Sequence, residues 1–271
     1  MQDKYDTSMS QTDWDPDQYR RFAEERAAPF WDLVSLVEAD GVGRLVDLGC
    51  GDGQLTVEAA RRLKVDSATG IDSSPAMLEK ADSIRDAGLA FEPGDIGNWT
   101  SESDFDLVLA NASLQWVPDH EAVLKRWTAA LAPGGQLAVQ VPANGDHPSH
   151  VVADEIGMVE PFYSAMDCDP PPNPTLVNVL APEVYATLLH DLGFVAQNVR
   201  LQVYPHVLRS SNEVVEWVRG TNLTRFFKRL PAEMHDPFID AYRERLLERI
   251  GDRSPYFFSF KRILMWGQLG R

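Results

Sequence analysis

Short apolar runs alternate with amphipathic stretches over the first half of the chain. Runs typical of β-strands occupy residues 44–48, 67–71, 89–92, 105–110 and 136–141, and helical spacing of apolar positions occupies 55–63, 75–87 and 121–131. Strands separated by helices imply βαβ units, in which helices cover both faces of a parallel sheet. The first half therefore predicts an α/β fold with a doubly wound, mostly parallel sheet.

Beyond Pro142 this alternation breaks. A proline-rich stretch at 170–174 predicts a loop or turn outside the core. The remaining pattern is helical at 182–192, extended at 195–207, helical at 212–218 and 231–250, and of β type at 256–266. Two helices between two extended segments predict a helical cap inserted between the last two strands. The two extended segments bring the predicted sheet to seven strands.

A helix is also expected near the N-terminus, from Asp15 to Glu38. Asp15 is a good N-cap, Pro16 suits the first helical position, and apolar residues recur at three- and four-residue spacing until Gly41. The residues before this helix are polar and are expected to fray. An amphipathic helix that follows such a tail is a candidate for a lid.

The charge of the chain limits its partners. Its 271 residues include 25 Lys and Arg against 41 Asp and Glu, which gives a net charge of −16. This charge repels nucleic acid and anionic membranes, so we expect neither as a partner. Two cysteines form no disulfide framework and no metal cluster, and the acidic N-terminus does not resemble a secretory signal. We expect a cytoplasmic protein without a metal, either a monomer or a weak homodimer.

A glycine-rich turn follows the first predicted strand and opens the first helix, where a parallel sheet presents its ligand crevice. The glycines follow G-x-G-x-G over residues 49–53, not the G-x-G-x-x-G of a dinucleotide site. Asp47 precedes the turn and Asp52 lies within it. Two acids repel a pyrophosphate but suit an ammonium group and a nucleoside hydroxyl. The turn therefore favours a nucleoside joined to a cationic amino acid.

Three more strand ends carry polar or aromatic candidates. Asp72 is placed to accept both hydroxyls of a ribose, although it could instead cap the next helix. Asp95 and Ile96 suit the amine and the ring face of an adenine, although Asp95 could be a turn acid. Residues 110–116 offer carbonyls, an amide and the ring of Trp116, which could instead be a core ring. Four such features at successive strand ends point to one binding crevice.

On these residues, the sequence resembles class I S-adenosylmethionine-dependent methyltransferases, and more narrowly the trans-aconitate 2-methyltransferase family. The matching stretches are residues 13–16 (DWDP), 47–51 (DLGCG), 70–77 (GIDSSPAM), 110–120 (ANASLQWVPDH) and 137–142 (LAVQVP). The resemblance implies a Rossmann-like methyltransferase fold that binds S-adenosyl-L-methionine. The candidates for cofactor binding are Tyr19, Arg26, Asp47, Gly49, Gly51, Asp72, Ser73, Asp95, Ile96, Asn111 and Leu114.

The resemblance also divides the chain and implies a small polycarboxylic acid, trans-aconitate, as substrate. We expect a tail and lid helix at 1–40, a cofactor-binding core at 41–145, 182–205 and 255–271, and a substrate-side cap at 146–181 and 206–254. In the cap, the family pattern of Trp-Val, Gly-Thr and Leu-Arg-Pro is kept only in part, because the arginine lies one residue late and the proline is missing. The substrate candidates are Gln115, Trp116, His206, Trp217, Arg219, Thr221, Arg225 and Arg262.

Methyl transfer to a carboxylate oxygen needs no general base, because a carboxylic acid is already ionised at pH 7. We therefore expect no catalytic side chain, only alignment of the reactants and exclusion of water. Arginines in so acidic a chain are the expected receptors for the other carboxylates. Three alternatives stay open: a malonyl-carrier-protein O-methyltransferase, an N- or C-methyltransferase with a base such as His206 or Tyr256, and a non-enzymatic S-adenosylmethionine-binding regulator.

Overall fold

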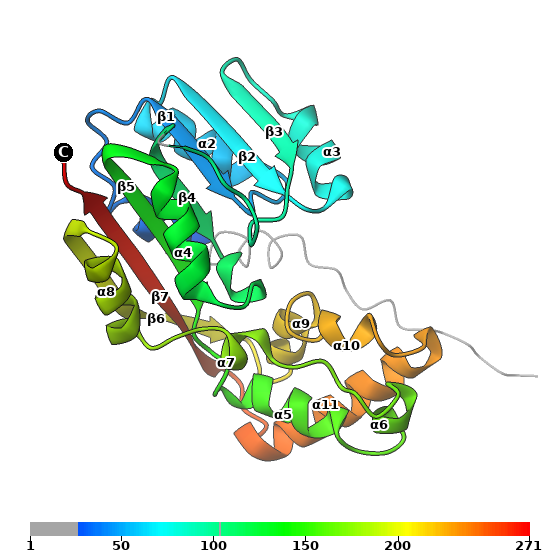
Figure 1. The fold of residues 1–271 in the computed structure, drawn as a ribbon. Helices are drawn as coiled ribbons and strands as arrows, with labels where there is room; N and C mark the ends of the chain where they lie inside the picture. Colours follow the sequence, from blue (N-terminus) through cyan, green and yellow to red (C-terminus); the bar gives the residue numbers. More distant parts are fainter. Residues whose placement is uncertain (1–26, 103) are drawn as a thin grey trace, which may run out of the picture.

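The computed structural model describes residues 27–102 and 104–271, in which seven strands form one sheet in the order β3-β2-β1-β4-β5-β7-β6 (Figure 1). The first five strands pair in parallel, and β7 runs antiparallel to both β5 and β6. The predicted mostly parallel, seven-stranded α/β sheet is confirmed. The strands are β1 (Arg44–Leu48), β2 (Ser67–Asp72), β3 (Leu89–Pro93), β4 (Phe105–Asn111), β5 (Leu131–Pro142), β6 (Phe194–Leu208) and β7 (Tyr256–Leu269).

Each face of the sheet is covered by helices because alternate residues of a strand point to opposite faces. Leu107 and Leu109 of β4 are buried in one apolar cluster with residues 27–34, which are helical, and with α2 (Gln54–Leu63). Val108 and Ala110 belong to a second cluster with α4 (His120–Ala129) and α8 (Pro182–Asp191). The sheet is thus doubly wound, and α3 (Pro75–Ser83) connects β2 to β3.

Two helices end four residues earlier than the apolar spacing predicts, and a serine lies at each end. The helix expected to reach Glu38 ends at residue 34, and the Ser35 hydroxyl donates to the Asp32 carbonyl at 2.7 Å. The helix expected to reach residue 87 ends at Ser83, whose hydroxyl donates to the Lys80 carbonyl at 2.6 Å. Serine side chains that bond nearby carbonyls compete with the helical ladder, which favours termination there.

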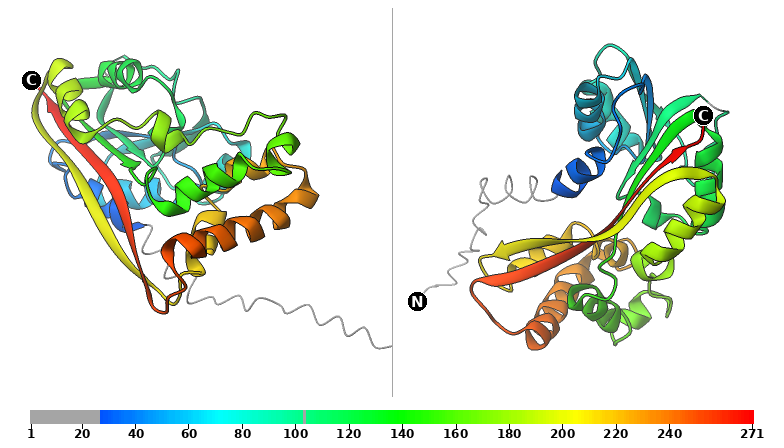
Figure 2. Two further views of the ribbon diagram at one scale, coloured as in Figure 1. Left: turned by 90° about the horizontal axis from the view of Figure 1, so that it is seen from below. Right: turned by 90° about the vertical axis from the view of Figure 1, so that its left-hand side faces the viewer.

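Two chain segments form a helical cap below the carboxyl edge of the sheet (Figures 1 and 2). The segment after β5 carries α5 (Pro148–Gly157), α6 (Phe162–Ala165) and α7 (Pro174–Val177). The segment between β6 and β7 carries α9 (Glu213–Arg219), α10 (Thr224–Phe227), the short 3-10 helix η2 (Ala232–Met234) and α11 (His235–Ile250). The predicted insertion before the last strand is confirmed. The elements α5 to α7 were not predicted, and Asn173 in the proline-rich stretch is buried rather than outside the core.

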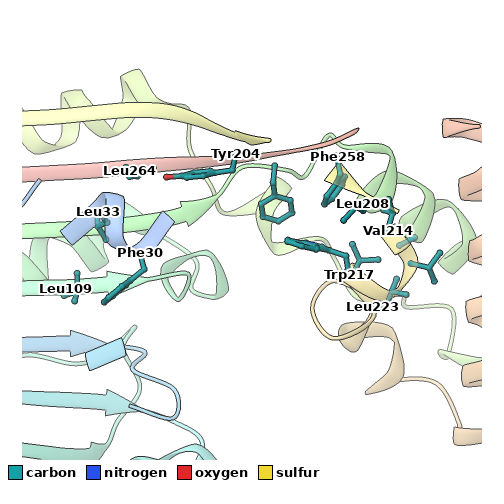
Figure 3. Close-up of a cluster of buried hydrophobic side chains, with 14 of the residues drawn as sticks. Phe30, Leu33, Leu109, Tyr204, Leu208, Val214, Trp217, Leu223, Phe258 and Leu264 are labelled. Carbon is teal, nitrogen blue, oxygen red and sulfur yellow. The ribbon is translucent and has the colours of Figure 1, made fainter. Parts of the chain in front are cut away.

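The long β6–β7 hairpin joins the cap to the sheet. One apolar cluster runs along it, from Phe30, Leu33 and Leu264 at the sheet to Trp217 and Phe258 under the cap (Figure 3). The cap segments are also tied to each other, because the Tyr242 hydroxyl of α11 donates to the Ser149 carbonyl of α5 at 2.9 Å. The cap therefore has a fixed place relative to the strand ends. Among the described residues, helices long and apolar enough to cross a membrane are absent.

Candidate functional site

A cavity of about 940 Å³ lies where the carboxyl ends of the parallel strands meet the cap. In doubly wound sheets this edge is where ligands bind. The sheet side contributes Ala27, Trp31, Asp52, Gln54, Leu55, Glu58, Asn111, Ala112, Gln115, Trp116, Gln140 and Pro142. The cap and the β7 strand contribute His150, Asn173, Pro174, Thr175, Trp217, Gly220, Thr221, Asn222, Thr224, Arg225, Phe260 and Arg262.

The glycine turn after β1 has one crowded and one open position. Gly49 has a φ of +86°, and a Cβ built on it would lie 2.3 Å from the Ser113 Cβ, so only glycine fits there. Gly51 also has a positive φ, but no described atom lies within 4 Å of where its Cβ would be. The Gly51 N–H donates to the Asp72 carboxylate at 2.9 Å. The turn is therefore held from β2 while its Gly51 side stays open for a ligand.

Asp72 holds the backbone on both sides of the crevice. One carboxylate oxygen accepts from Gly51, and the other accepts from the Ser74 N–H at 2.8 Å, just before α3. The capping alternative thus describes part of its role. A carboxylate has about four acceptor sites, so two remain for a ligand hydroxyl pair. The neighbouring Ser73 side chain is exposed.

Asp47 is a buried acid with one unsatisfied oxygen. Its side chain is 3% exposed, and its Oδ2 accepts from the Thr56 hydroxyl at 2.5 Å. Its Oδ1 is buried and has no hydrogen-bond partner in the described part of the chain. Burial raises the pKa of Asp47 to about 6, against the lowering effect of the Thr56 hydrogen bond. A cationic donor would satisfy Oδ1 and lower the pKa of this group.

Asp95 and Ile96 both have local structural roles after β3. The Asp95 carboxylate accepts from the Gly97 N–H at 2.9 Å and from the Asn98 amide at 2.7 Å, which is the bonding of a turn acid. Ile96 is half-buried, and its carbonyl accepts from the Trp127 indole at 3.0 Å. These bonds are local and do not involve a ligand, so an adenine contact by Asp95 or Ile96 remains a prediction.

The end of β4 places its polar groups at the cavity. The Asn111 Oδ1 accepts from the Gln140 amide of β5 at 2.8 Å, and both residues line the cavity. Gln115 is buried and lines it too, with its amide donating to the Ala112 carbonyl at 2.6 Å. Trp116 is 56% exposed at the rim, so the core-ring alternative is wrong.

Leu114 does not place its side chain at the cavity. It is fully buried in the cluster shared with α4 and α8. Its carbonyl accepts from the His120 ring at 3.0 Å. The short 3-10 turn at residues 114–116 thus points the Leu114 side chain into the core, and a cofactor contact by Leu114 remains a prediction.

Of the three candidate arginines, two line the cavity. Arg262 of β7 does so with its guanidinium 4.2 Å from the centre of the Phe260 ring. Arg225 also lines the cavity, but its guanidinium is paired with the Asp154 carboxylate. Arg219 does not line the cavity; its side chain is half exposed and its guanidinium lies 3.9 Å from the Glu216 carboxylate. The expectation that Arg219 faces the substrate is wrong.

The neutral cap candidates divide in the same way. Trp217 and Thr221 line the cavity. His206 does not, because it is buried among aromatic rings, with its ring centre 4.8 Å from that of Trp217. The alternation along β6 accounts for this, since His206 shares the buried face with Tyr204 and Leu208.

Comparison with known proteins places this site in a family. A family model described as a methyltransferase domain matches residues 40–167. The trans-aconitate 2-methyltransferase of Deinococcus radiodurans is 40% identical over 260 residues, covering 93% of this chain and 96% of that protein. The corresponding protein of Mycobacterium tuberculosis is 36% identical, covering 95% and 97%.

The chain belongs to the trans-aconitate 2-methyltransferase family. It is therefore an S-adenosylmethionine-dependent methyltransferase. Two solved structures share the fold. The Bacillus subtilis YcgJ protein has a TM-score of 0.57 at 15% identity and covers 90% of this chain and 98% of its own. Phosphoethanolamine N-methyltransferase 2 of Haemonchus contortus, bound to S-adenosyl-L-methionine, has a TM-score of 0.54 at 16% identity and covers 89% and 53%.

The methyltransferase cavity also contains residues that the sequence did not single out. His150 and Asn173 come from the cap segment, and Trp31 and Gln140 come from the sheet side. His150 is buried, and its pKa is lowered to about 3. Burial is the largest cause, and the charges of His147, Arg225 and Arg262 lower the pKa further. The sequence signal that could have found His150 is Pro148, which begins α5 two positions before it. Tyr19 and Arg26 of the predicted lid lie outside the described residues, which begin with Ala27 at the cavity wall.

Proposed function

We propose that this methyltransferase transfers a methyl group to one carboxylate oxygen of a small polycarboxylic acid, trans-aconitate. The observation that supports this most is the placement of Arg262 at the cavity of a chain with a net charge of −16. Arg225 lines the same cavity but is paired with Asp154. An anion with several charges needs fixed cations to enter so acidic a protein. The relatives that cover almost the whole chain carry the name of this activity.

The residues at the strand ends fit the cofactor. The unsatisfied Oδ1 of Asp47 suits an ammonium group, the open side of Gly51 leaves room for a ligand, and Asp72 retains acceptor sites for ribose hydroxyls. When bound, S-adenosyl-L-methionine supplies a methyl group activated by a positively charged sulfur. Contacts from the other candidates remain predictions: Tyr19, Arg26, Gly49, Ser73, Asp95, Ile96, Asn111 and Leu114.

The reaction needs no general base from the protein. A carboxylic acid with a pKa near 4 is ionised at pH 7 and can act as the nucleophile directly. The contribution of the chain is to bind the acid beside the strand ends, to hold its oxygen in line, and to exclude water. Arg262, Thr221 and Trp217 are the cap residues that we assign to binding and walling the acid.

The alternatives that need a base find less support. His206, the expected base for a neutral substrate, is buried in an aromatic cluster and does not line the cavity. Tyr256 is buried at the start of β7, and burial raises its pKa. A raised pKa makes a phenol a poorer base at pH 7, because less of it is ionised.

We further propose the division of labour that the sequence suggested. Residues 1–40 would act as tail and lid, residues 41–145, 182–205 and 255–271 as cofactor-binding core, and residues 146–181 and 206–254 as substrate-side cap. Support for the lid comes from Ala27 and Trp31, which line the cavity where the described chain begins. Full activity in a chain that starts at residue 27 would exclude this role.

We infer a cytoplasmic monomer or weak homodimer. The protein acts on a small molecule and binds neither nucleic acid nor membrane. Gel filtration of the purified protein tests the oligomeric state.

A comparison of acceptors tests the proposal. The purified protein is given S-adenosyl-L-methionine with, separately, trans-aconitate, other di- and tricarboxylic acids, a malonyl-carrier protein, and a neutral amine or phenol. The highest kcat/KM is expected for trans-aconitate. A higher value for the carrier protein or a neutral acceptor would contradict the proposed substrate, and cofactor binding without any transfer would indicate a regulator.

A further inference from the structure

A hydroxyl at the start of α5 lies between two histidine rings. The Ser149 Oγ is 2.9 Å from the His147 Nδ1 and 3.1 Å from the His150 Nδ1. The Ser149 N–H also donates to the His147 Nδ1, at 3.2 Å. His147 therefore carries no proton on Nδ1, because that nitrogen is the acceptor of a backbone N–H.

The single proton of the Ser149 hydroxyl decides the state of His150. If the hydroxyl donates to the His147 Nδ1, the His150 Nδ1 must donate to Ser149, and the His150 Nε2 is left as an acceptor. If the hydroxyl turns toward His150, its Nδ1 becomes the acceptor and its Nε2 carries the proton. The first arrangement places a proton in both contacts of the Ser149 Oγ, whereas the second leaves the Ser149 oxygen facing the His147 Nδ1 without one, so we assign the first arrangement to the ligand-free protein.

The Nε2 of His150 is the ring nitrogen that its contact with Ser149 leaves for a ligand. His150 is 7% exposed and lines the cavity, and its Nδ1 side is turned to Ser149. Among residues 27–102 and 104–271, no hydrogen bond to its Nε2 is formed. The ring is close enough to Arg225 and Arg262 for both charges to lower its pKa, and all three residues line the same cavity.

We propose that His150 is a substrate-specificity residue that binds a non-reacting carboxylate of the acid through Nε2–H, and that Ser149 is the positioning residue that permits this state by turning its hydroxyl toward the His150 Nδ1. The inference rests on the proposed function and names the group that receives part of the substrate. Binding thus moves one proton of a neutral ring from Nδ1 to Nε2, by exchange with water, and changes no net charge.

A neutral Nε2–H donor on His150 selects substrates differently from an additional arginine in the cavity. Arg262 supplies charge, whereas His150 supplies one directed hydrogen bond whose partner must be an acceptor. The ring stays neutral at pH 7 because burial, His147 and two arginines lower its pKa. Asp146 is the nearby acid that raises this pKa, and its effect is smaller. His150 therefore distinguishes acids that carry a carboxylate at this position from those that carry a hydrogen or a methyl group there.

Histidine NMR on the wild-type protein tests the tautomer directly. The protein is labelled with 15N-histidine and saturated with S-adenosylhomocysteine, which prevents turnover, and trans-aconitate is then added. The His150 signals, identified by their absence in His150→Gln, should change from the Nδ1–H to the Nε2–H form. An unchanged His150 tautomer at saturating trans-aconitate would overturn the inference without touching the proposed function.

Kinetics of matched variants give the second readout. His150→Leu should raise the KM for trans-aconitate about tenfold and change kcat less, whereas His150→Gln, which keeps an amide donor, should recover part of the loss. Ser149→Ala should raise KM by less than His150→Leu, and His190→Gln, at an exposed histidine of α8, should change nothing. Equal KM values for wild type and His150→Leu contradict the inference alone. A wild type that neither binds nor methylates any polycarboxylate removes the proposed function and this inference together.

Discussion

The hydroxyl of Thr56, in the first turn of α2, donates to the carboxylate of Asp47, in β1, at 2.5 Å. This bond ties the helix that follows the glycine turn to the strand that precedes it. It satisfies one oxygen of Asp47 and leaves the other buried without a partner among the described residues. The acid is therefore poised to respond to a bound cation.

Cofactor affinity should depend on pH through Asp47. Its pKa is raised to about 6 by burial, so the cofactor-free protein holds a mostly neutral carboxyl below that pH. An ammonium group favours the carboxylate, so binding releases a proton, and affinity for S-adenosylhomocysteine should rise roughly tenfold from pH 5 to pH 7. Calorimetry at both pH values measures this. Asp47→Asn should bind with little pH dependence, and equal wild-type affinities at pH 5 and pH 7 would contradict the assignment.

The same shift has a consequence for stability. The folded pKa of Asp47 lies above its ordinary value of 3.8, so the folded state holds this proton more tightly than the unfolded chain does. Taken alone, Asp47 lowers the free energy of unfolding as pH rises from about 4 to about 6, and the full cost is present above pH 6. Asp47→Asn should therefore gain stability relative to wild type over that interval in urea unfolding.

Asp72→Ala should weaken binding of S-adenosylhomocysteine by about 1–3 kcal/mol, because a charge-assisted contact to the ribose is lost. Part of this loss comes from the turn, since Asp72 also holds the Gly51 N–H. Asp72→Asn keeps a side-chain acceptor and should lose less. Calorimetry that finds unchanged affinity in Asp72→Ala would exclude the ribose role.

Arg262→Ala should raise the KM for trans-aconitate by about ten- to hundredfold, because a charged hydrogen bond is worth about 1.5–3 kcal/mol. Arg219→Ala is the matched control, since Arg219 is half exposed beside Glu216 and does not line the cavity. Added salt should reduce the difference between wild type and Arg262→Ala, since screening weakens attraction of an anion. Equal effects of the two substitutions would remove Arg262 from the substrate site.

The Arg225–Asp154 pair should support the cap more than it binds substrate. The Arg225 side chain is 6% exposed, so removal of its partner leaves a buried charge. Asp154→Ala should lower the free energy of unfolding by about 3–5 kcal/mol. Arg229→Ala, which breaks a cap pair with exposures of 41% and 79%, should cost less than about 1 kcal/mol in urea unfolding. A small effect of Asp154→Ala would mean that Arg225 is instead available to a substrate.

The central sheet could be predicted from sequence because its signal is simple. Residues such as 44–48 and 105–110 are buried on both faces and read as short apolar runs between glycines and helices. The helix α5 was missed because its buried face includes Ser149 and His150, so apolar and polar positions do not mark its inner side. The two early helix ends depend on single serine hydroxyls, which apolar spacing does not register.

The same reasoning separates the site residues. Gly49 and Asp72 could be found because the turn and the strand ends impose their positions. Arg219 and Arg225 could not be ranked, since the choice between solvent and cavity depends on how α9 and α10 pack, which lies outside local sequence. His206 could have been recognised as a core residue from strand alternation, whereas the pairing of Arg225 with Asp154 joins residues 71 positions apart.

The identity of the methylated atom shows whether this enzyme is a carboxyl methyltransferase. The enzyme is incubated with S-adenosyl-L-methionine carrying a 13C-labelled methyl group and with an equimolar mixture of trans-aconitate and a neutral amine or phenol, and the products are examined by NMR. We expect one new methyl ester signal on trans-aconitate, which is lost on mild alkaline hydrolysis and strongly reduced with Arg262→Ala. Label that appears instead on the nitrogen or phenolic oxygen of the neutral acceptor, with no effect of Arg262→Ala, would contradict it.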